Sequence, residues 1–181
     1  MGISTGGLFG HSQIGVHLSI VNDVLFYPRS LDNPSVELLE TSFQMEMQPF
    51  LIGGSALLGS LLRGNKNGIA VADIAFQDEL DELTSFGDVV VMQSGVNAAG
   101  NLIECNNNGA IVSPTVPDDG LEMISDVLGV PSLTTTVAHQ DSIGSLLVAN
   151  NHGVLAHPDI TPLEVEIIEN TLQVPLMVGT V

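Results

Sequence analysis

One short pattern recurs along this chain of 181 residues, and its repetition constrains the fold more than any other feature. In three copies a glycine is followed nine positions later by a second glycine that closes a polar turn. The three pairs are Gly59 and Gly68, Gly100 and Gly109, and Gly144 and Gly153. A looser copy begins at Ile14, and the four copies start 44, 41 and 44 residues apart. A fixed period of this length is typical of repeat architectures, in which each unit is completed by its neighbours.

Each copy predicts the same local structure. A polar turn such as Asn150 to Gly153, between two apolar runs, predicts a β-hairpin. A helical pattern follows, and in the last copy Thr161-Pro162-Leu163-Glu164 forms a capping box with proline at the first helical position. A short β-branched or apolar run then predicts a third strand, at 49–54, 89–93, 132–137 and 175–181. Each repeat is therefore expected to be strand, turn, strand, helix, strand.

The expected helices are amphipathic, with their acidic residues on the outer face. The apolar positions predicted to share one face are Val36, Leu39 and Phe43, then Phe76, Leu80 and Leu83, then Leu121, Ile124 and Leu128, and finally Val165, Ile168 and Leu172. The repeats are placed at about 14–57, 58–98, 99–142 and 143–181, within one domain. Because one such unit cannot cover both faces of its sheet, neighbouring units must pack together.

The composition is apolar enough for a sizeable core, with 44% hydrophobic residues, but it is poor in cations. Only 3 residues are Lys or Arg against 21 Asp and Glu, for a formal net charge of −18. Nucleic-acid binding depends on neutralising phosphates with Lys and Arg, so a basic protein is the better partner. An acid-adapted or halophile-like surface is an alternative explanation of the same charge.

The sequence also predicts where in the cell the protein lies and whether it binds a metal or a cofactor. A lone cysteine forms no internal disulfide, and no apolar stretch has the length of a membrane helix, which predicts a cytoplasmic protein. The five histidines, His11, His17, His139, His152 and His157, lack metal-ligand spacing, and no phosphate-binding glycine loop occurs. We therefore expect no metal, no cofactor and an inert, buried Cys105.

Four ordered stretches carry a resemblance to a known family: "IGGSALLGSLLRGNKNGIAV", "NAAGNLIECNNNGAIVSP", "TVAHQDSIGSLLVANNHGVLAHP" and "LQVPLMVGTV". The chain from about Ile14 to Val181 resembles the translation initiation factor 6 family, the ribosome anti-association factor of archaea and eukaryotes. The resemblance implies an α/β pentein fold, a short propeller of strand-strand-helix-strand repeats with pseudo-five-fold symmetry. Only four repeats are counted in this chain.

The resemblance also implies a function without catalysis. Family members bind the large ribosomal subunit, chiefly a ribosomal protein near the sarcin–ricin loop, and block joining of the small subunit until subunit biogenesis is complete. For a eukaryotic member the location would also be nuclear or nucleolar. Because Arg63 and Lys66 are nearly the only cations on the face concerned, little direct contact with ribosomal RNA is expected.

The ribosome-facing surface of this family is formed around the first strand and following turn of the repeats. By transfer to matching positions, the residues beside the repeat glycines are Val16, Ser60, Asn101 and Ser145, and the turn residues are Asn65, Lys66, Asn106 and Asn150. Asn101 is the preferred single candidate, as a polar amide that begins an apolar strand. The alternative is that these polar groups hydrogen-bond their own turns and strand ends.

The count of four repeats leaves three explanations open: the chain is a truncated product, the fifth position is filled by something else, or four units close differently. Exposed unit ends predict self-association. Two further functions stay open at this stage: a pentein-fold enzyme acting on a guanidino substrate, and a repeat scaffold that has lost ribosome binding.

Overall fold

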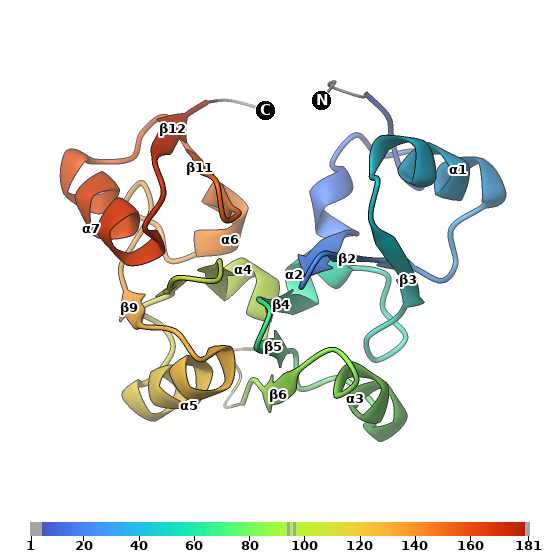
Figure 1. The fold of residues 1–181 in the computed structure, drawn as a ribbon, viewed down its shortest axis with the longest axis horizontal. Coiled ribbons are helices and arrows are strands. Elements are labelled where there is room, and N and C mark those ends of the chain that lie inside the picture. Colours follow the sequence, from blue (N-terminus) through green and yellow to red (C-terminus); the bar gives the residue numbers. More distant parts are fainter. Residues whose placement is uncertain (1–4, 94, 96, 180–181) are drawn as a thin grey trace.

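The computed structural model describes residues 5–93, 95 and 97–179. These residues form a mixed α/β fold of four units, each with a short helical turn, a three-stranded sheet and a longer helix. Figure 1 shows the units side by side around a common centre, with the first and the last unit on either side of the same opening. Each sheet is built from the strands of one predicted repeat.

The units follow one another in chain order. Unit 1 contains η1 (Ile14–Val16), β1 (Ser19–Val21), β2 (Val24–Pro28), α1 (Asn33–Ser42) and β3 (Glu46–Phe50). Unit 2 contains α2 (Leu58–Leu61), β4 (Leu62–Gly64), β5 (Gly68–Val71), α3 (Gln77–Leu83) and β6 (Asp88–Val91). Unit 3 contains α4 (Ala99–Leu102), β7 (Ile103–Cys105), β8 (Ala110–Val112), α5 (Asp118–Leu128) and β9 (Ser132–Thr134). Unit 4 contains α6 (Ile143–Leu146), β10 (Leu147–Ala149), β11 (Val154–Ala156), α7 (Pro162–Leu172) and β12 (Leu176–Val178).

Every sheet has the same topology. The first two strands form the predicted antiparallel hairpin, as in β10 and β11, where Val148 lies opposite Leu155. The third strand pairs in parallel with the second, and Leu155 lies opposite Met177 of β12. A parallel pair needs a crossover connection, and the longer helix of each unit provides it. The predicted hairpins and third strands are confirmed, although the third strands are shorter than predicted. The first of them, predicted at 49–54, begins three residues earlier, and residues 180–181 of the last lie outside the described residues.

The segments beside the repeat glycines differ from the prediction. They begin as the short helices η1, α2, α4 and α6 rather than as strands, and these helices contact one another in sequence. A methyl group on Gly59 would overlap the carbonyl oxygen of Gly15, and the same holds for Gly100 against Gly59 and Gly144 against Gly100. The repeat glycines are therefore needed because the backbones of adjacent units meet there.

The predicted helix faces are mostly confirmed. Leu39, Leu83, Ile124 and Ile168 are buried on the inner faces of α1, α3, α5 and α7. Phe76 is the exception, since it is the N-cap residue of α3 and 58% of its surface is exposed. A residue at the N-cap precedes the first helical turn, so its side chain does not share the inner face of the helix.

The hydrophobic cores lie between units as well as within them. Ala70 of β5 belongs to the same core cluster as Ile103 and Ile124 of unit 3. Ile111 of β8 belongs to the cluster formed by Ile168 and other residues of unit 4. The longer helix of one unit therefore covers the sheet of the unit before it, as the repeat pattern requires.

The glycine contacts generate a stability prediction. Gly100→Ala is expected to lower the free energy of unfolding by about 3 kcal/mol or more, because backbone rather than a mobile side chain occupies the space of the new methyl group. Gly15→Ala is the matched control, since no atom in the described part of the chain lies within 4 Å of that methyl position. Urea unfolding of both variants measures the difference, and equal stabilities would contradict it.

Candidate functional site

The eight predicted site residues fall into two groups at opposite ends of the first strands. Val16, Ser60, Asn101 and Ser145 lie on the short helices, and Asn65, Lys66, Asn106 and Asn150 lie in the turns. In units 2, 3 and 4, a first strand of three residues separates the two groups, which corresponds to about 10 Å. The structure therefore presents two candidate surfaces.

The first surface is a row around the centre of the molecule, here called the axial row. It consists of Val16, Ser60, Asn101 and Ser145, each beside a repeat glycine on one of four successively packed short helices. Val16 and Ser145 are exposed, and Ser60 and Asn101 are half-buried. Asn101 lies within α4 and not at the start of a strand, which corrects the predicted setting of this residue.

The second candidate surface is formed by the hairpin turns. Two of its asparagines are in fact buried and hold adjacent units together. The Asn65 side chain is 3% exposed, and its Nδ2 donates to the carbonyl oxygens of Asn106 at 3.1 Å and of Leu128 at 2.9 Å. Asn106 is 4% exposed, and its Nδ2 donates in the same way to Asn150 at 3.1 Å and Leu172 at 2.8 Å. Each amide thus binds the turn and the helix end of the following unit.

The Oδ1 atoms of the same asparagines organise their own turns. Oδ1 of Asn106 accepts from the backbone N–H groups of Asn108 and Gly109 at 2.9 and 3.1 Å. Oδ1 of Asn150 accepts equivalent bonds in its own turn, but Asn150 is exposed. The amide groups of Asn65 and Asn106 are fully engaged, so of the turn residues Lys66 and Asn150 are the ones exposed to a partner.

A charged pair at the centre was not identified from the sequence. Nη2 of Arg63 lies 3.5 Å from Oε2 of Glu104 and donates to the carbonyl oxygen of Gly100 at 3.1 Å. Glu104 is 1% exposed, and its burial raises the pKa of its carboxyl group while the Arg63 charge opposes that rise. Arg63 is therefore mostly buried and paired, which corrects its expected place on the partner-facing surface. A charge in the middle of the short strands β4 and β7 was the available sequence signal.

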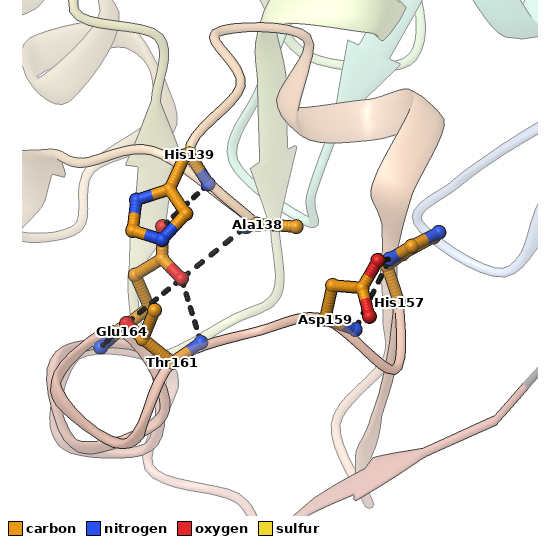
Figure 2. Close-up of polar contacts among 6 residues, drawn as sticks. All are labelled: Ala138, His139, His157, Asp159, Thr161 and Glu164. Carbon is orange, nitrogen blue, oxygen red and sulfur yellow. Dashed lines mark hydrogen bonds and ion pairs between the residues drawn. The ribbon is translucent and has the colours of Figure 1, made fainter.

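The best-satisfied carboxylate is that of Glu164, in the capping box of α7. Its oxygens accept from Thr136 Oγ1 at 2.6 Å, from the backbone N–H groups of Ala138 and His139 at 3.2 Å, and from Thr161 N and Oγ1 at 2.8 and 2.9 Å. Figure 2 shows this carboxylate between the start of α7 and the preceding loop. Burial alone would raise the pKa of Glu164, but these hydrogen bonds outweigh it and lower the pKa to about 2.

The same arrangement recurs in unit 2. Oε2 of Glu79 accepts from the backbone N–H groups of Phe76 at 2.9 Å and of Gly53 at 2.7 Å. The predicted capping box of α7 is thus confirmed, and its glutamate has a second role that spacing alone did not reveal. It ties the start of a helix to the loop that enters the unit.

The cysteine and two of the histidines are placed where they contribute to the structure of the fold. Cys105 is 5% exposed, and burial first, then the neighbouring Glu104 charge, raise the pKa of its thiol to about 12 against a lowering by Arg63. A thiol this hard to ionise is a poor nucleophile at neutral pH. His17 is buried with Nδ1 3.0 Å from the Ala56 carbonyl oxygen, and Figure 2 shows His157 beside Asp159.

The described residues contain neither a metal-ligand cluster nor a membrane-spanning helix. Within residues 5–93, 95 and 97–179, no three His, Cys, Asp or Glu side chains are grouped as metal ligands would be. In the same part of the chain, α5 and α7 have 11 residues each, and no helix has the length and apolar character needed to span a bilayer.

The asparagine bonds predict unequal effects of equivalent substitutions. Asn106→Ala is expected to lower the free energy of unfolding by about 3 kcal/mol, because it removes bonds within its turn and two bonds to unit 4. The Leu172 carbonyl then keeps only the 3.2 Å bond from Asn108 Nδ2. Asn150→Ala removes only bonds within its own turn and is expected to cost about 1 kcal/mol. Urea denaturation measures both, and a larger loss in Asn150→Ala would refute this account.

The lowered pKa of Glu164 predicts a dependence of stability on pH. Because the folded-state pKa of about 2 lies below the ordinary glutamate pKa of 4.5, the carboxylate stabilises the fold above about pH 4.5 and this contribution is lost as the pH falls toward 2. Glu164→Gln is expected to lose about 2 kcal/mol at pH 7 and to show a weaker decline between pH 5 and pH 2. Parallel pH profiles of the two proteins would contradict the prediction.

Comparison with known proteins gives consistent matches. The model of the eIF-6 family matches residues 3–181. Translation initiation factor 6 of Methanothermobacter thermautotrophicus is 37% identical over 132 residues, which cover 72% of this chain and 60% of that protein. The Picrophilus torridus protein of the same name is 36% identical over 126 residues, 69% of this chain and 58% of the relative.

A third relative, translation initiation factor 6 of Natronomonas pharaonis, is 35% identical over 126 residues, 68% of this chain and 57% of that protein. The matched segment thus spans about 60% of the length of these curated relatives. Since the family model covers residues 3–181, nearly the whole chain, this chain belongs to the eIF-6 family.

Proposed function

We propose that this protein is a ribosome anti-association factor. It binds the large ribosomal subunit, occupies volume that the small subunit needs, and acts during large-subunit biogenesis. Membership of the eIF-6 family carries the proposal, together with relatives named as translation initiation factors. We further propose a pentein-like, propeller arrangement of the units, which the packing of units around one centre supports.

The charge distribution favours a basic protein as the direct partner. Of the three cations, Arg63 is buried in an ion pair and Arg29 lies 3.8 Å from Glu82, while Lys66 is exposed. With 21 acidic residues in the chain, electrostatic attraction favours a basic ribosomal protein, such as the one near the sarcin–ricin loop, over ribosomal RNA.

The axial row is the surface that we propose to meet this partner. Four successive units each contribute one of its members, Val16, Ser60, Asn101 and Ser145, from a short helix held against its neighbours by backbone contact. Interfaces gain affinity when their contact groups are held rigidly before binding. Lys66 and Asn150, in the exposed parts of the turns, are the remaining candidates from the second surface.

Occlusion of the small subunit requires no catalytic group. The mechanism depends on a rigid body bound at one site, in the cytoplasm and, in a eukaryote, also in the nucleolus. The alternative of a guanidino-processing enzyme would need an accessible nucleophile, and the buried Cys105 with its raised pKa does not suit that role. A scaffold that has lost ribosome binding is the alternative that experiment must separate.

The deciding experiment is co-sedimentation of the purified chain with isolated archaeal large subunits at two salt concentrations, followed by a subunit-joining assay. We expect retention that weakens at the higher salt, because exposed charges are screened, and reduced joining of the small subunit. A folded chain that stays in the supernatant at both salt concentrations would refute the proposal and favour the scaffold.

A matched pair of variants locates the surface. Ser145→Tyr places a large side chain on the axial row and is expected to weaken retention about ten-fold. Ser30→Tyr makes the same change at an exposed serine that follows β2, and is expected to bind normally. Equal retention of the two variants would show that the axial row does not meet the subunit.

A further inference from the structure

Two peptide bonds of the chain join an asparagine to a glycine, Asn67–Gly68 and Asn108–Gly109. Such a bond is chemically labile in a mobile chain, because glycine has no side chain to keep its backbone nitrogen away from the preceding carboxamide. Both bonds lie in hairpin turns against which the following unit packs, and both asparagines are exposed to water. The turn of unit 4 has His152 at the equivalent position.

The reaction to which such a bond is prone is deamidation, and asparagine is for this reason a thermolabile residue. The backbone nitrogen of the glycine forms a bond to Cγ of the asparagine, the bond from Cγ to Nδ2 breaks, and ammonia leaves with the proton of the glycine N–H. Water then opens the succinimide ring and yields aspartate or isoaspartate. The reaction needs no reagent except water, but the glycine nitrogen and the carboxamide must be free to turn toward each other.

In unit 3 both reacting groups are engaged in other contacts. The N–H of Gly109 donates to Oδ1 of Asn106 at 3.1 Å, and Nδ2 of Asn108 donates to the carbonyl oxygen of Leu172 at 3.2 Å. Gly109 is also buried against α7, where the carbonyl oxygen of Thr171 occupies the space of an added methyl group. Ring closure therefore requires both hydrogen bonds to break, and the second of them is made with unit 4.

The equivalent groups of unit 2 are engaged in the same way. The N–H of Gly68 donates to Oδ1 of Asn65 at 3.3 Å, and Nδ2 of Asn67 donates to the carbonyl oxygen of Leu128 at 2.8 Å. Leu128 is the last residue of α5, so here the second bond is made with unit 3.

One further contact distinguishes the two bonds. The carbonyl oxygen of Asn67 accepts from the backbone N–H of Asp88 at 3.1 Å, which fixes the peptide group that would have to rotate. In unit 3, Pro131 occupies the equivalent position beside Gly109. Proline has no N–H to donate, so the peptide group after Asn108 lacks this bond and is held less firmly.

We infer that Asn67 and Asn108 are deamidation sites that stay intact because the next unit is docked, and that Asn108 is the faster of the two. Local separation of units 3 and 4 frees the two reacting groups, and the reaction follows from that open state. The product carboxylate cannot donate to Leu172 and repels its carbonyl oxygen, so the modified units are held together less firmly. The inference rests on the contacts between units and not on the proposed function.

The test follows deamidation of the full-length chain at mildly alkaline pH by peptide mapping with mass spectrometry. The same chain unfolded in urea gives the intrinsic rate of each bond. We expect Asn108 to react about a hundred-fold more slowly in the folded chain than in urea, because the rate scales with the open fraction. Within the folded chain we expect Asn108 to react about five-fold faster than Asn67, which has one hydrogen bond more. In urea this difference is expected to disappear.

A matched pair of variants tests the role of the turn. Asn106→Ala frees the N–H of Gly109 and removes bonds to unit 4, and is expected to raise the rate at Asn108 about ten-fold or more. The rate at Asn67 is expected to stay the same. Asn150→Ala is the matched change in the turn of unit 4, and it is expected to leave both rates unaltered.

A third variant separates opening between units from unfolding of the whole chain. Leu39→Ala shortens a buried side chain of α1 in unit 1 and destabilises the fold without a change at the turn of unit 3. It is expected to leave the rate at Asn108 unaltered. Circular dichroism confirms that each variant is folded before the rates are compared.

Three results would overturn the inference. They are equal rates at Asn108 in the folded and the urea-unfolded chain, an unaltered rate in folded Asn106→Ala, and a rise in Leu39→Ala as large as that in Asn106→Ala. A faster reaction at Asn67 than at Asn108 in the unaltered folded chain would contradict the assigned order, and this measurement does not depend on any variant.

Discussion

The asparagine carboxamide at the start of the turns of units 2 and 3 is the interaction on which the arrangement of units 2, 3 and 4 depends. In Asn65 and Asn106 one side chain shapes its own turn through Oδ1 and holds the next unit through Nδ2. A buried amide with any of these bonds missing would be costly, so its burial specifies one relative placement of two units. The turn that defines the hairpin is thus also the joint between hairpins.

The repeat glycines act at the other end of the first strand. Backbones of adjacent short helices approach so closely at Gly59, Gly100 and Gly144 that a side chain of any size would overlap a neighbouring carbonyl group. With a backbone contact at one end of the strand and an amide contact at the other, unit 2 is held to unit 3, and unit 3 to unit 4, at two points. This explains why the nine-residue spacing between the two glycines is kept in three of the copies.

The few charged groups that are well buried have internal roles. Arg63 and Glu104 pair near the centre, and Glu79 and Glu164 join helix starts to the preceding loops. A buried ion pair contributes little to net stability when desolvation is counted, but removing one partner leaves an uncompensated charge. The outer surface is consequently strongly acidic, which is the electrostatic basis for proposing a basic partner.

The sequence by itself determined the hairpins, the helix starts and the repeat period, because these depend on neighbouring residues. The capping box at Thr161 and Glu164 and the turn at Asn150 to Gly153 needed no distant contact to be predicted. Only the tertiary structure decided that Asn106 is buried while Asn150 is exposed, since the two turns have nearly the same local sequence and differ in whether another unit lies against them. It also decided the short helices at the glycines and the burial of Arg63, because both arise from contacts between residues about 40 positions apart, and local preference does not specify such contacts.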